Sequence, residues 1–411
     1  MNPFPLILAD LRAMRITAVF SVLLIALSIA MGIAVSAQER ALRKASARAA
    51  DDFPLLIGAA GSETQLVLSA VYLQPYALPL LDGATLKRLA GDPRVSGLSP
   101  VAPGDIYRGW PIVGVAPELV TRWGRVAPFE GRVFLKMGEA VLGSEVRLRM
   151  GEEFFATHGR AGDKHAPGEE DEDEDQHRHD NGAFVAVGRM PATGSPFDRA
   201  ILVPIESVWA IHGQSVSHGG DLSRLGPPFD GDVPGVPAVV VRPKQVADAY
   251  QLRSEYRHNG ALALFPAEVL TSIYQSLGDV RDLLVAASAA NNLLLLASIL
   301  MLATILVGLR RRRYAVLRAL GATRTFVALT IWGGLVSLLA IGASLGLLLG
   351  FGAARLLSTW MQMRSGLALA PALGDGEILF SLGIFLVGAL LMGAVSTVMA
   401  LKGDVAKQLR F

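Results

Sequence analysis

The residues of this chain best suited to chemistry are histidines and carboxylates gathered near its middle. Residues 163–180 read DKHAPGEEDEDEDQHRHD, and one further histidine precedes them. Imidazole and carboxylate groups together suit Zn²⁺ or a related divalent ion. The candidate ligands are His158, His165, His177, His179 and Asp180.

The same residues have a second interpretation, in which metal binds weakly if at all. An acidic run of this density repels itself, so residues 163–180 are expected to form a solvated, disordered insertion. The spacing of the histidines is not that of a structural zinc site. Both interpretations stay open: an insertion that senses or collects Zn²⁺, and a solvated low-complexity loop.

Motifs of common enzymes are missing from the sequence. It contains no GxxxxGK[ST] phosphate loop and no HExxH metalloprotease motif, and no constellation of residues indicates a hydrolase. The absence of cysteine excludes disulfides and thiolate metal ligands. We therefore expect no catalytic residue and no bound cofactor other than the candidate metal.

The composition is that of a membrane protein, with 52% hydrophobic residues and a mean hydropathy of +0.42. Four apolar segments are long enough to cross the roughly 30 Å hydrocarbon core of a bilayer. They are residues 16–37, 283–309, 327–351 and 378–401. None of them carries a charge that would mark an ion path or a proton relay.

A cleaved signal peptide is the rival interpretation of residues 16–37, with Arg12 and Arg15 at its basic end. The apolar core of a signal peptide has roughly 7–15 residues, and this segment is longer. Helix-forming residues also follow it directly. We therefore expect an uncleaved first span, preceded by a short interfacial helix on the cytoplasmic side at residues 1–15.

The densest basic segment, residues 310–326, lies between two of the apolar segments and begins RRRRYAVLRALGAT. Arginine at this density beside membrane spans predicts a cytoplasmic loop. An apolar ridge recurs at helical spacing and consists of Tyr314, Leu317 and Leu320. Gly321 is a natural helix stop, and Thr323 can cap the next helix. The segment is therefore a short amphipathic helix that offers its ridge to a partner, or else a loop that only orients the spans.

Small residues at four-residue spacing predict close packing between the apolar helices. They are Gly342, Gly346 and Gly350 in the third segment and Ala389 and Gly393 in the fourth. Four spans with such faces make a poor channel alone, and they are better suited to pairing with a second subunit.

A mixed domain of α+β class is expected over residues 38–282, since no apolar run of spanning length interrupts it. The predicted strands lie at residues 112–115, 184–187, 201–203 and 238–241, and the predicted helices at 84–89 and 144–150. Residues 191–196 predict a rigid turn, followed by Asp198 as a cap or as a partner of Arg199. From Pro266 a helix is expected to continue as a stalk into the second span.

The arginine and lysine distribution predicts one topology, with both termini in the cytoplasm and the α+β domain outside a cell inner (plasma) membrane. Residues 352–377 then form a short outer loop and residues 402–411 a cytoplasmic tail. The pI of 8.9 does not indicate nucleic acid as a partner, because the basic residues flank membrane spans.

The order of basic residues, aromatic residue and AVLRALGAT in residues 310–323 resembles the coupling segment of the FtsX/MacB-like (LolC/LolE-like) family of ABC transporter permeases. Residues 55–74 and 188–209 also resemble periplasmic-core segments of that family. The resemblance implies four spans, helical stalks and a MacB-like periplasmic core domain. It also implies a separate ATPase subunit, which binds ATP and Mg²⁺, and a second permease copy or a paralogue.

By this resemblance, the residues that couple to the ATPase are Tyr314, Leu317, Arg318, Leu320, Gly321, Ala322 and Thr323. The implied function is mechanotransmission: ATP hydrolysis by the partner moves the outer domain, which exports or extracts a lipoprotein, a peptide or another amphiphile. Two alternatives remain. The chain could regulate a periplasmic partner such as a cell-wall hydrolase, or it could be a metal-responsive membrane protein.

Overall fold

The computed structural model describes residues 2–158, 178–214, 224–276 and 313–365, with scattered positions between 286 and 308 and between 383 and 398. These residues divide into two compact units. The helical unit comprises Met1–Leu42, Leu277–Trp360 and Ala370–Phe411. The α+β domain comprises Arg43–Ser276 and Met361–Leu369.

The helical unit begins with α1 (Phe4–Ala13) and continues with α2 (Arg15–Ala50). Met14 separates the two helices because its backbone, at φ −116° and ψ 38°, leaves the helical region. As expected from the sequence, the first apolar helix runs on well beyond residue 37 without a break. The long helix α10 (Arg324–Ser365) follows the basic segment.

By length and composition, α2 and α10 contain the two described helical segments that are able to cross a bilayer, Arg15–Gln38 and Arg324–Gln362. A shorter apolar helix, Leu386–Val395, falls inside the fourth predicted span. Most of the second predicted span, residues 283–309, lies outside the described residues. The count of four spans therefore stays a prediction.

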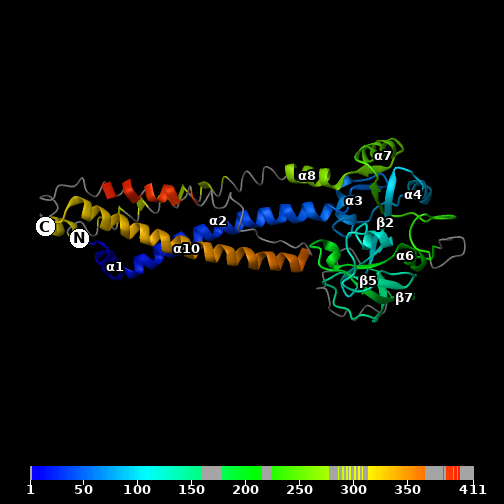
Figure 1. Ribbon diagram of the computed structural model, residues 1–411, viewed down its shortest axis with the longest axis horizontal. Helices are drawn as coiled ribbons and strands as arrows, with labels where there is room; N and C mark the ends of the chain where they lie inside the picture. The colour runs from blue at the N-terminus through cyan, green and yellow to red at the C-terminus, as the bar shows by residue number, and fades with distance from the viewer. Residues whose placement is uncertain are drawn as a thin grey trace. The chain divides into compact units, whose positions relative to one another are not determined.

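Helices α2 and α10 lie side by side and touch through the glycines of α10 (Figure 1). A Cβ atom on Gly342 would lie 2.8 Å from Ile25, and one on Gly346 would lie 2.8 Å from the carbonyl oxygen of Ala26. Such distances leave no room for a side chain. Ala389 is 3% exposed in the same apolar cluster, whereas a Cβ on Gly393 would still have 3.6 Å to its nearest neighbour.

Helix α10 is longer than the sequence predicts, which corrects the expected outer loop over residues 352–377. Residues 352–365 continue the helix to Ser365. No glycine or proline interrupts residues 353–365. The charged side chain of Arg355, near the start of this stretch, packs on the helix itself. The guanidinium of Arg355 lies 4.5 Å from the ring centroid of Phe351.

The α+β domain is built on a sheet with ten strands in the described residues, in the order β10-β1-β9-β2-β3-β8-β5-β7-β4, while β6 pairs with β2 and β7. Neighbours are antiparallel except for the pairs β3–β8 and β5–β7. The strands are β1 (Leu55–Gly58), β2 (Val95–Tyr107), β3 (Trp110–Val115), β4 (Glu130–Gly131), β5 (Glu139–Leu142), β6 (Glu153–His158), β7 (Arg178–Arg189), β8 (Ile201–Pro204), β9 (Ala238–Pro243) and β10 (Leu262–Leu264).

Short helices pack on this sheet and enclose two apolar cores. The first core lies between β1, β9, α4 and α7, and the second between β3, β5, β7 and β8. The helices are α3 (Glu63–Ala70), α4 (Gly83–Ala90), α5 (Pro117–Val120), α6 (Ile205–Ile211), α7 (Val246–His258) and α8 (Pro266–Ser276), with a 3-10 turn η2 (Pro196–Arg199). Asp82 caps α4 by accepting from the N–H of Thr85 at 2.7 Å.

The four predicted strands and the helix predicted at residues 84–89 are confirmed, as β3, β7, β8, β9 and α4. The helix predicted at residues 144–150 is wrong, because this segment is irregular. Val146 and Leu148 both enter the second core at alternate positions, and their carbonyl oxygens accept from the Arg189 guanidinium at 2.6 and 2.5 Å. Those bonds and that alternation favour an extended backbone over a helix.

The first and the last strand of the segment Arg43–Ser276 are neighbours in the sheet. Helix α2 leads into β1, and β10 leads into α8. The two strands are antiparallel, with Leu56 opposite Leu264. Because one strand begins where the other ends, the two helices join the domain at the same end of this strand pair.

Candidate functional site

The basic segment contains a short helix, residues 313–319, that stops at a tight turn before α10. Gly321 has a φ of +97°, a left-handed value that glycine adopts without steric cost. Its N–H donates to the carbonyl of Arg318 at 3.1 Å, and the N–H of Ala322 donates to that of Leu317 at 3.0 Å. These two bonds define a Schellman motif.

Helix α10 then starts with a side-chain cap. The N–H of Phe326 donates to Thr323 Oγ1 at 3.2 Å, and the N–H of Val327 donates to the Thr323 carbonyl at 3.2 Å. Residues 313–323 are therefore an ordered helix and turn, called the corner below.

The apolar ridge predicted for the corner divides between inward and outward positions. Tyr314 is half-buried and packs on Val327 and Ile331 of α10. Leu317 and Arg318 are half-buried, whereas Leu320 is 81% exposed.

The outward apolar surface of the corner consists of Val316 and Leu320. Val316 is 44% exposed and lies one helical turn before Leu320. The sequence reasoning missed Val316, although its four-residue spacing from Leu320 was a usable signal. Beside it, Ala315 is only 1% exposed, so the inner face of the helix contacts its own unit.

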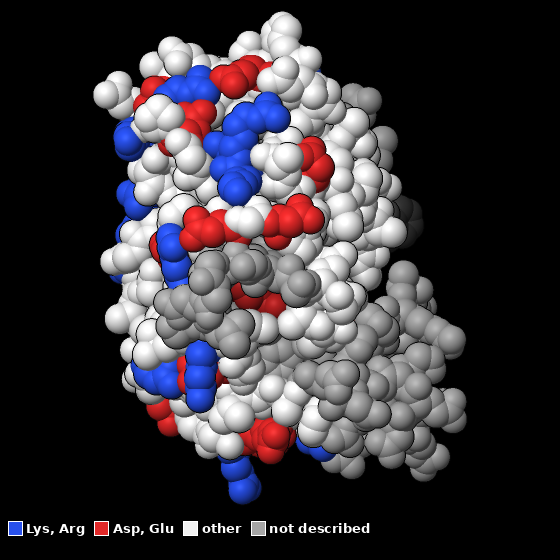
Figure 2. All heavy atoms as spheres, turned by 90° about the vertical axis from the view of Figure 1, so that its right-hand side faces the viewer, with Lys and Arg blue, Asp and Glu red and all other residues white. Residues whose placement is uncertain are grey.

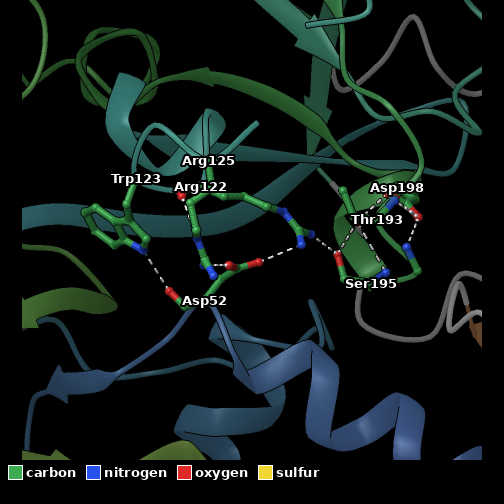
Figure 3. Close-up of polar contacts among 8 residues, drawn as sticks. Asp52, Arg122, Trp123, Arg125, Thr193, Ser195 and Asp198 are labelled. Atoms are coloured by element: carbon green, nitrogen blue, oxygen red, sulfur yellow. Dashed lines mark hydrogen bonds and ion pairs between the residues drawn. The ribbon is translucent and has the colours of Figure 1, made fainter. Parts of the chain in front are cut away.

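A second polar cluster lies in the α+β domain, directly after α2 (Figure 3). Asp52 is 6% exposed and pairs with Arg122 Nη1 at 2.7 Å and with Arg125. Its carbonyl oxygen accepts from Trp123 Nε1 at 3.0 Å. The other Arg122 terminal nitrogen, Nη2, donates to Ser195 Oγ at 2.8 Å. We call this cluster the Asp52 junction; its members are Asp52, Arg122, Trp123, Arg125, Thr193, Ser195 and Asp198.

The loop that supplies the arginines is held in a backbone conformation that side chains rarely adopt. Arg122 and Trp123 have φ values of 49° and 61°, and such left-handed residues cost free energy, so they persist only where surrounding contacts hold them. Burial lowers the pKa of Arg122, and the nearby Asp52 carboxylate opposes that shift. Since arginine keeps its proton in proteins, the Arg122–Asp52 contact is an ion pair between charged groups.

The turn at residues 193–198 forms the other half of the junction. Asp198 Oδ2 accepts from Gly194 N–H at 2.7 Å, and its Oδ1 accepts from Thr193 N–H and Oγ1 at 2.9 and 2.5 Å. The turn expected from the sequence is confirmed, and Asp198 acts as its cap. Arg199 contacts the ring of Trp110, 5.6 Å from its centroid.

The corner also lies within the part of the chain that matches a known family. Residues 288–405 match the model of the FtsX-like permease C-terminal domain. This part of the chain is therefore similar to the C-terminal domain of the FtsX-like permeases. Members of this family are membrane proteins and, in general, components of ABC transporters without catalytic activity of their own.

An ABC transporter permease of this family generally works with an ATPase partner. No curated protein matches this chain. Among solved structures, it is similar to the extracellular domain of the noncanonic ABC-type transporter YknZ from Gram-positive bacteria, at 10% identity and a TM-score of 0.29 over 51% of this chain and 98% of that one. A likeness this weak carries no argument about fold or function.

Three of the five candidate metal ligands, His158, His179 and Asp180, belong to the described strands β6 and β7. His165 and His177 lie outside the described residues, as does most of the expected insertion. Residues 178–180 correct its boundary, because their backbone belongs to β7, where Arg178 pairs with Thr157 of β6. Among the described residues, no group of three histidine or acidic side chains could hold a metal ion. Metal binding stays a prediction.

One acid–histidine pair stands beside the strand that carries His158. His212 Nε2 lies 4.0 Å from Asp105 Oδ1, and Asp105 is opposite His158 in the pairing of β2 with β6. The sequence reasoning did not select Asp105 or His212. Asp105 lies on β2 and His212 directly after α6. Because the two residues are far apart in the sequence, no motif spacing indicates that they are neighbours.

Proposed function

We propose that this chain is the membrane subunit of an ABC-type complex, in which a separate ATPase subunit docks on the corner and drives movement of the α+β domain on the opposite side of the membrane. The observation that supports this most is the exposed pair Val316 and Leu320 on an ordered helix. A loop that only oriented the spans would need neither a Schellman stop nor a capped restart.

The docking argument rests on burial. A helix as short as residues 313–319 is marginal in water, so packing of Tyr314 and Ala315 on its own unit holds it in place. That packing leaves Val316 and Leu320 facing outward. An apolar pair on a fixed helix suits a hydrophobic groove of a partner, and the ATPase is the partner that the family implies.

The route to the domain follows the chain. The corner continues directly into α10, and α10 packs on α2 through Gly342 and Gly346. Helix α2 then leads into β1 of the sheet. A displacement at the corner would therefore reach the sheet through two helices in close contact.

For the cargo we propose an amphiphile such as a lipoprotein or a peptide. An open cavity of the domain is lined mostly by apolar side chains, among them Val133, Phe134 and Leu135, and also by Glu118 and Thr121. Leu135 is 64% exposed, and Phe129 in the same segment is 70% exposed. Figure 2 shows acidic and basic side chains interspersed on one face of the molecule, so that face offers no single charge to select a strongly charged cargo.

The test is the Leu320→Asp variant, expressed with the cognate ATPase, which is identified by a Walker A motif in a neighbouring reading frame. Leu320 is so exposed that folding should be unaffected. An unpaired carboxylate in an apolar contact costs several kcal/mol, so affinity for the ATPase should fall by about 100-fold or more. Arg313→Ala, at an exposed site of the same helix, is the matched control and should bind normally.

Purified complexes in nanodiscs would be compared by titration of the ATPase and by ATP turnover. We expect Leu320→Asp to lose both binding and stimulated turnover, with Val316→Asp behaving alike. Full binding and turnover in both aspartate variants would reduce the corner to a topology signal and overturn the docking proposal.

A further inference from the structure

The end of α2 and the end of α10 lead to the same turn of the α+β domain. Asp52 lies just beyond α2, and Gln362 lies in the last turns of α10; both belong to the domain's compact unit. Gln362 Nε2 donates to Glu145 Oε1 at 3.0 Å. The backbone N–H of Glu145 donates to the carbonyl of Asp198 at 2.8 Å.

These contacts extend the Asp52 junction into one continuous hydrogen-bonded path. Arg122 links Asp52 to Ser195, and Ser195 Oγ lies 2.8 Å from Thr193 Oγ1 within the turn capped by Asp198 (Figure 3). In order, the path runs through Asp52, Arg122, Ser195, Thr193, Asp198, Glu145 and Gln362.

The turn contacts neighbouring segments on two sides. Phe53, 4% exposed, lies with its ring centroid 5.7 Å from that of Phe197. On another side, a Cβ on Gly143 would lie only 2.4 Å from the carbonyl oxygens of Phe197 and Asp198. The backbone after β5 is therefore pressed against the turn on this side.

We propose that Arg122 is a positioning residue that joins the ends of α2 and α10 through the turn at residues 193–198. A displacement of α2 then reaches α10 through the domain as well as through direct helix packing. The inference rests on the proposed function, which supplies the ATP-driven displacement. The inference adds that the turn at residues 193–198 is the part of the domain that receives this displacement.

The side chain of Arg122 is suited to this task in three ways. Its planar guanidinium contacts Asp52 and Ser195 through two different nitrogens, Nη1 and Nη2, and the single nitrogen of a lysine cannot copy that spacing. Its side chain is 20% exposed, so water screens the ion pair only partly. Its left-handed backbone fixes the direction in which it leaves the loop.

Removal of this side chain should break the path without unfolding the domain. In Arg122→Gln the buried Asp52 carboxylate keeps Arg125 as a partner and the Trp123 contact to its carbonyl. Arg94→Gln is a matched control, because Arg94 is also a partly exposed arginine between two groups, Asp92 at 2.6 Å and Glu255 at 2.7 Å. The control residues take no part in the path.

The chain contains no cysteine, so paired spin labels can be placed without background. The full chain in nanodiscs would carry labels at Thr64→Cys and Thr359→Cys, to follow the domain against α10, or at Thr64→Cys and Val35→Cys, to follow it against α2. All three sites are exposed and helical. Distance distributions would be measured by pulsed electron spin resonance.

We expect Arg122→Gln to widen both distributions at least twofold. Gln362→Leu should widen only the distribution between the domain and α10, since it cuts the path at its last bond. Arg122→Lys should fall between Arg122→Gln and the unmodified chain, and Arg94→Gln should leave both widths unchanged. Unchanged widths in Arg122→Gln, or equal widening in Arg94→Gln, would overturn the proposal.

A second readout separates positioning from general stability. With the ATPase bound, trapping by ATP and vanadate should shift the distance between the domain and α10, and Arg122→Gln should lose this shift while it retains ATPase binding. A retained shift would overturn the proposal. If the unmodified complex shows no shift in this distance, the proposed function fails independently of Arg122. The widths of the distance distributions measured without nucleotide then still decide whether Arg122 joins the ends of α2 and α10.

Discussion

At the scale of single residues, Glu139 shows how local contacts set a pH response in the domain. Its carboxylate is 6% exposed and accepts from both terminal nitrogens of Arg132, at 2.6 and 2.7 Å. The N–H of Leu135 donates to it at 2.8 Å. The Arg132 hydrogen bonds are the main reason that the pKa of Glu139 falls to about 2.

A carboxylate with a lowered pKa stabilises the folded chain at neutral pH. That contribution is complete above its pKa in the unfolded chain, about 4.3, and is lost as the pH falls from there towards 2. Glu139→Gln should therefore lower the free energy of unfolding at pH 7 by about 1–3 kcal/mol. The difference from the unmodified chain should shrink steadily below pH 4.

Tryptophan fluorescence of the full chain in detergent, recorded at several pH values during urea unfolding, would measure this difference. Glu63→Gln, at an exposed ion pair with Arg257, is a control and should have little effect at any pH. A destabilisation of Glu139→Gln that is the same at pH 3 as at pH 7 would contradict the assignment.

Residues that act locally could be predicted from the sequence, and those that act across the fold could not. The stop at Gly321 and the cap at Thr323 depend on neighbours within five positions, so spacing shows them. Arg122 and Ser195, by contrast, are 73 positions apart. Only the order of the strands brings them together, and one sequence does not contain that order.

At the scale of elements, the fit between α2 and α10 depends on glycines with no room for a side chain. A Cβ on Gly346 would lie 2.8 Å from the Ala26 carbonyl oxygen, whereas one on Gly352, six positions further along the same helix, would have nothing within 4 Å. Gly346→Leu should therefore force the helices apart at a cost of about 1–3 kcal/mol.

Gly352→Leu is the matched control, since it makes the same change on the same helix at an open position. Thermal unfolding in detergent, followed by circular dichroism, should show a lower midpoint for Gly346→Leu and an unchanged or higher one for Gly352→Leu. Equal midpoints in the two variants would show that α2 and α10 do not pack through this face.

Two expected elements failed for identifiable physical reasons. Residues 144–150 have the composition of a helix, but the Arg189 guanidinium binds two of their carbonyls and the second core takes alternate side chains. The apolar run of the third predicted span ends at residue 351, but residues 353–365 contain no helix breaker and the helix continues to Ser365. Tertiary contacts outweighed the helical composition of residues 144–150. In residues 353–365 the preceding helix simply continued.

At the scale of the whole molecule, the class of membrane protein with an α+β domain could be predicted from the sequence, because hydropathy separates the two units along the chain. The apolar segments mark the helical unit, and the strand-like runs mark the α+β domain. The order of the strands could not be predicted from the sequence, because β1 lies between β9 and β10, which come from the far end of the domain in the chain. The pairing of β1 with β10 puts the first and the last strand of the segment Arg43–Ser276 side by side.

The proposed function requires the domain and the corner to lie on opposite sides of the membrane, and single cysteines can test this without truncating the chain. Gly104 is exposed on β2 with open space around it, and Leu320 is the most exposed apolar residue of the corner. Since the chain has no other cysteine, Gly104→Cys and Leu320→Cys each give one reactive site.

In intact spheroplasts, a membrane-impermeant maleimide should label Gly104→Cys and leave Leu320→Cys unlabelled, and detergent should then expose Leu320→Cys. The physical reason is the arginine cluster beside the corner. The free energy of placing these positive charges is lowest on the side of the membrane with anionic lipid and negative potential. Labelling of both sites in intact spheroplasts, or of Leu320→Cys alone, would place the corner outside. An ATPase could not then reach it, and the docking proposal would fail with the topology.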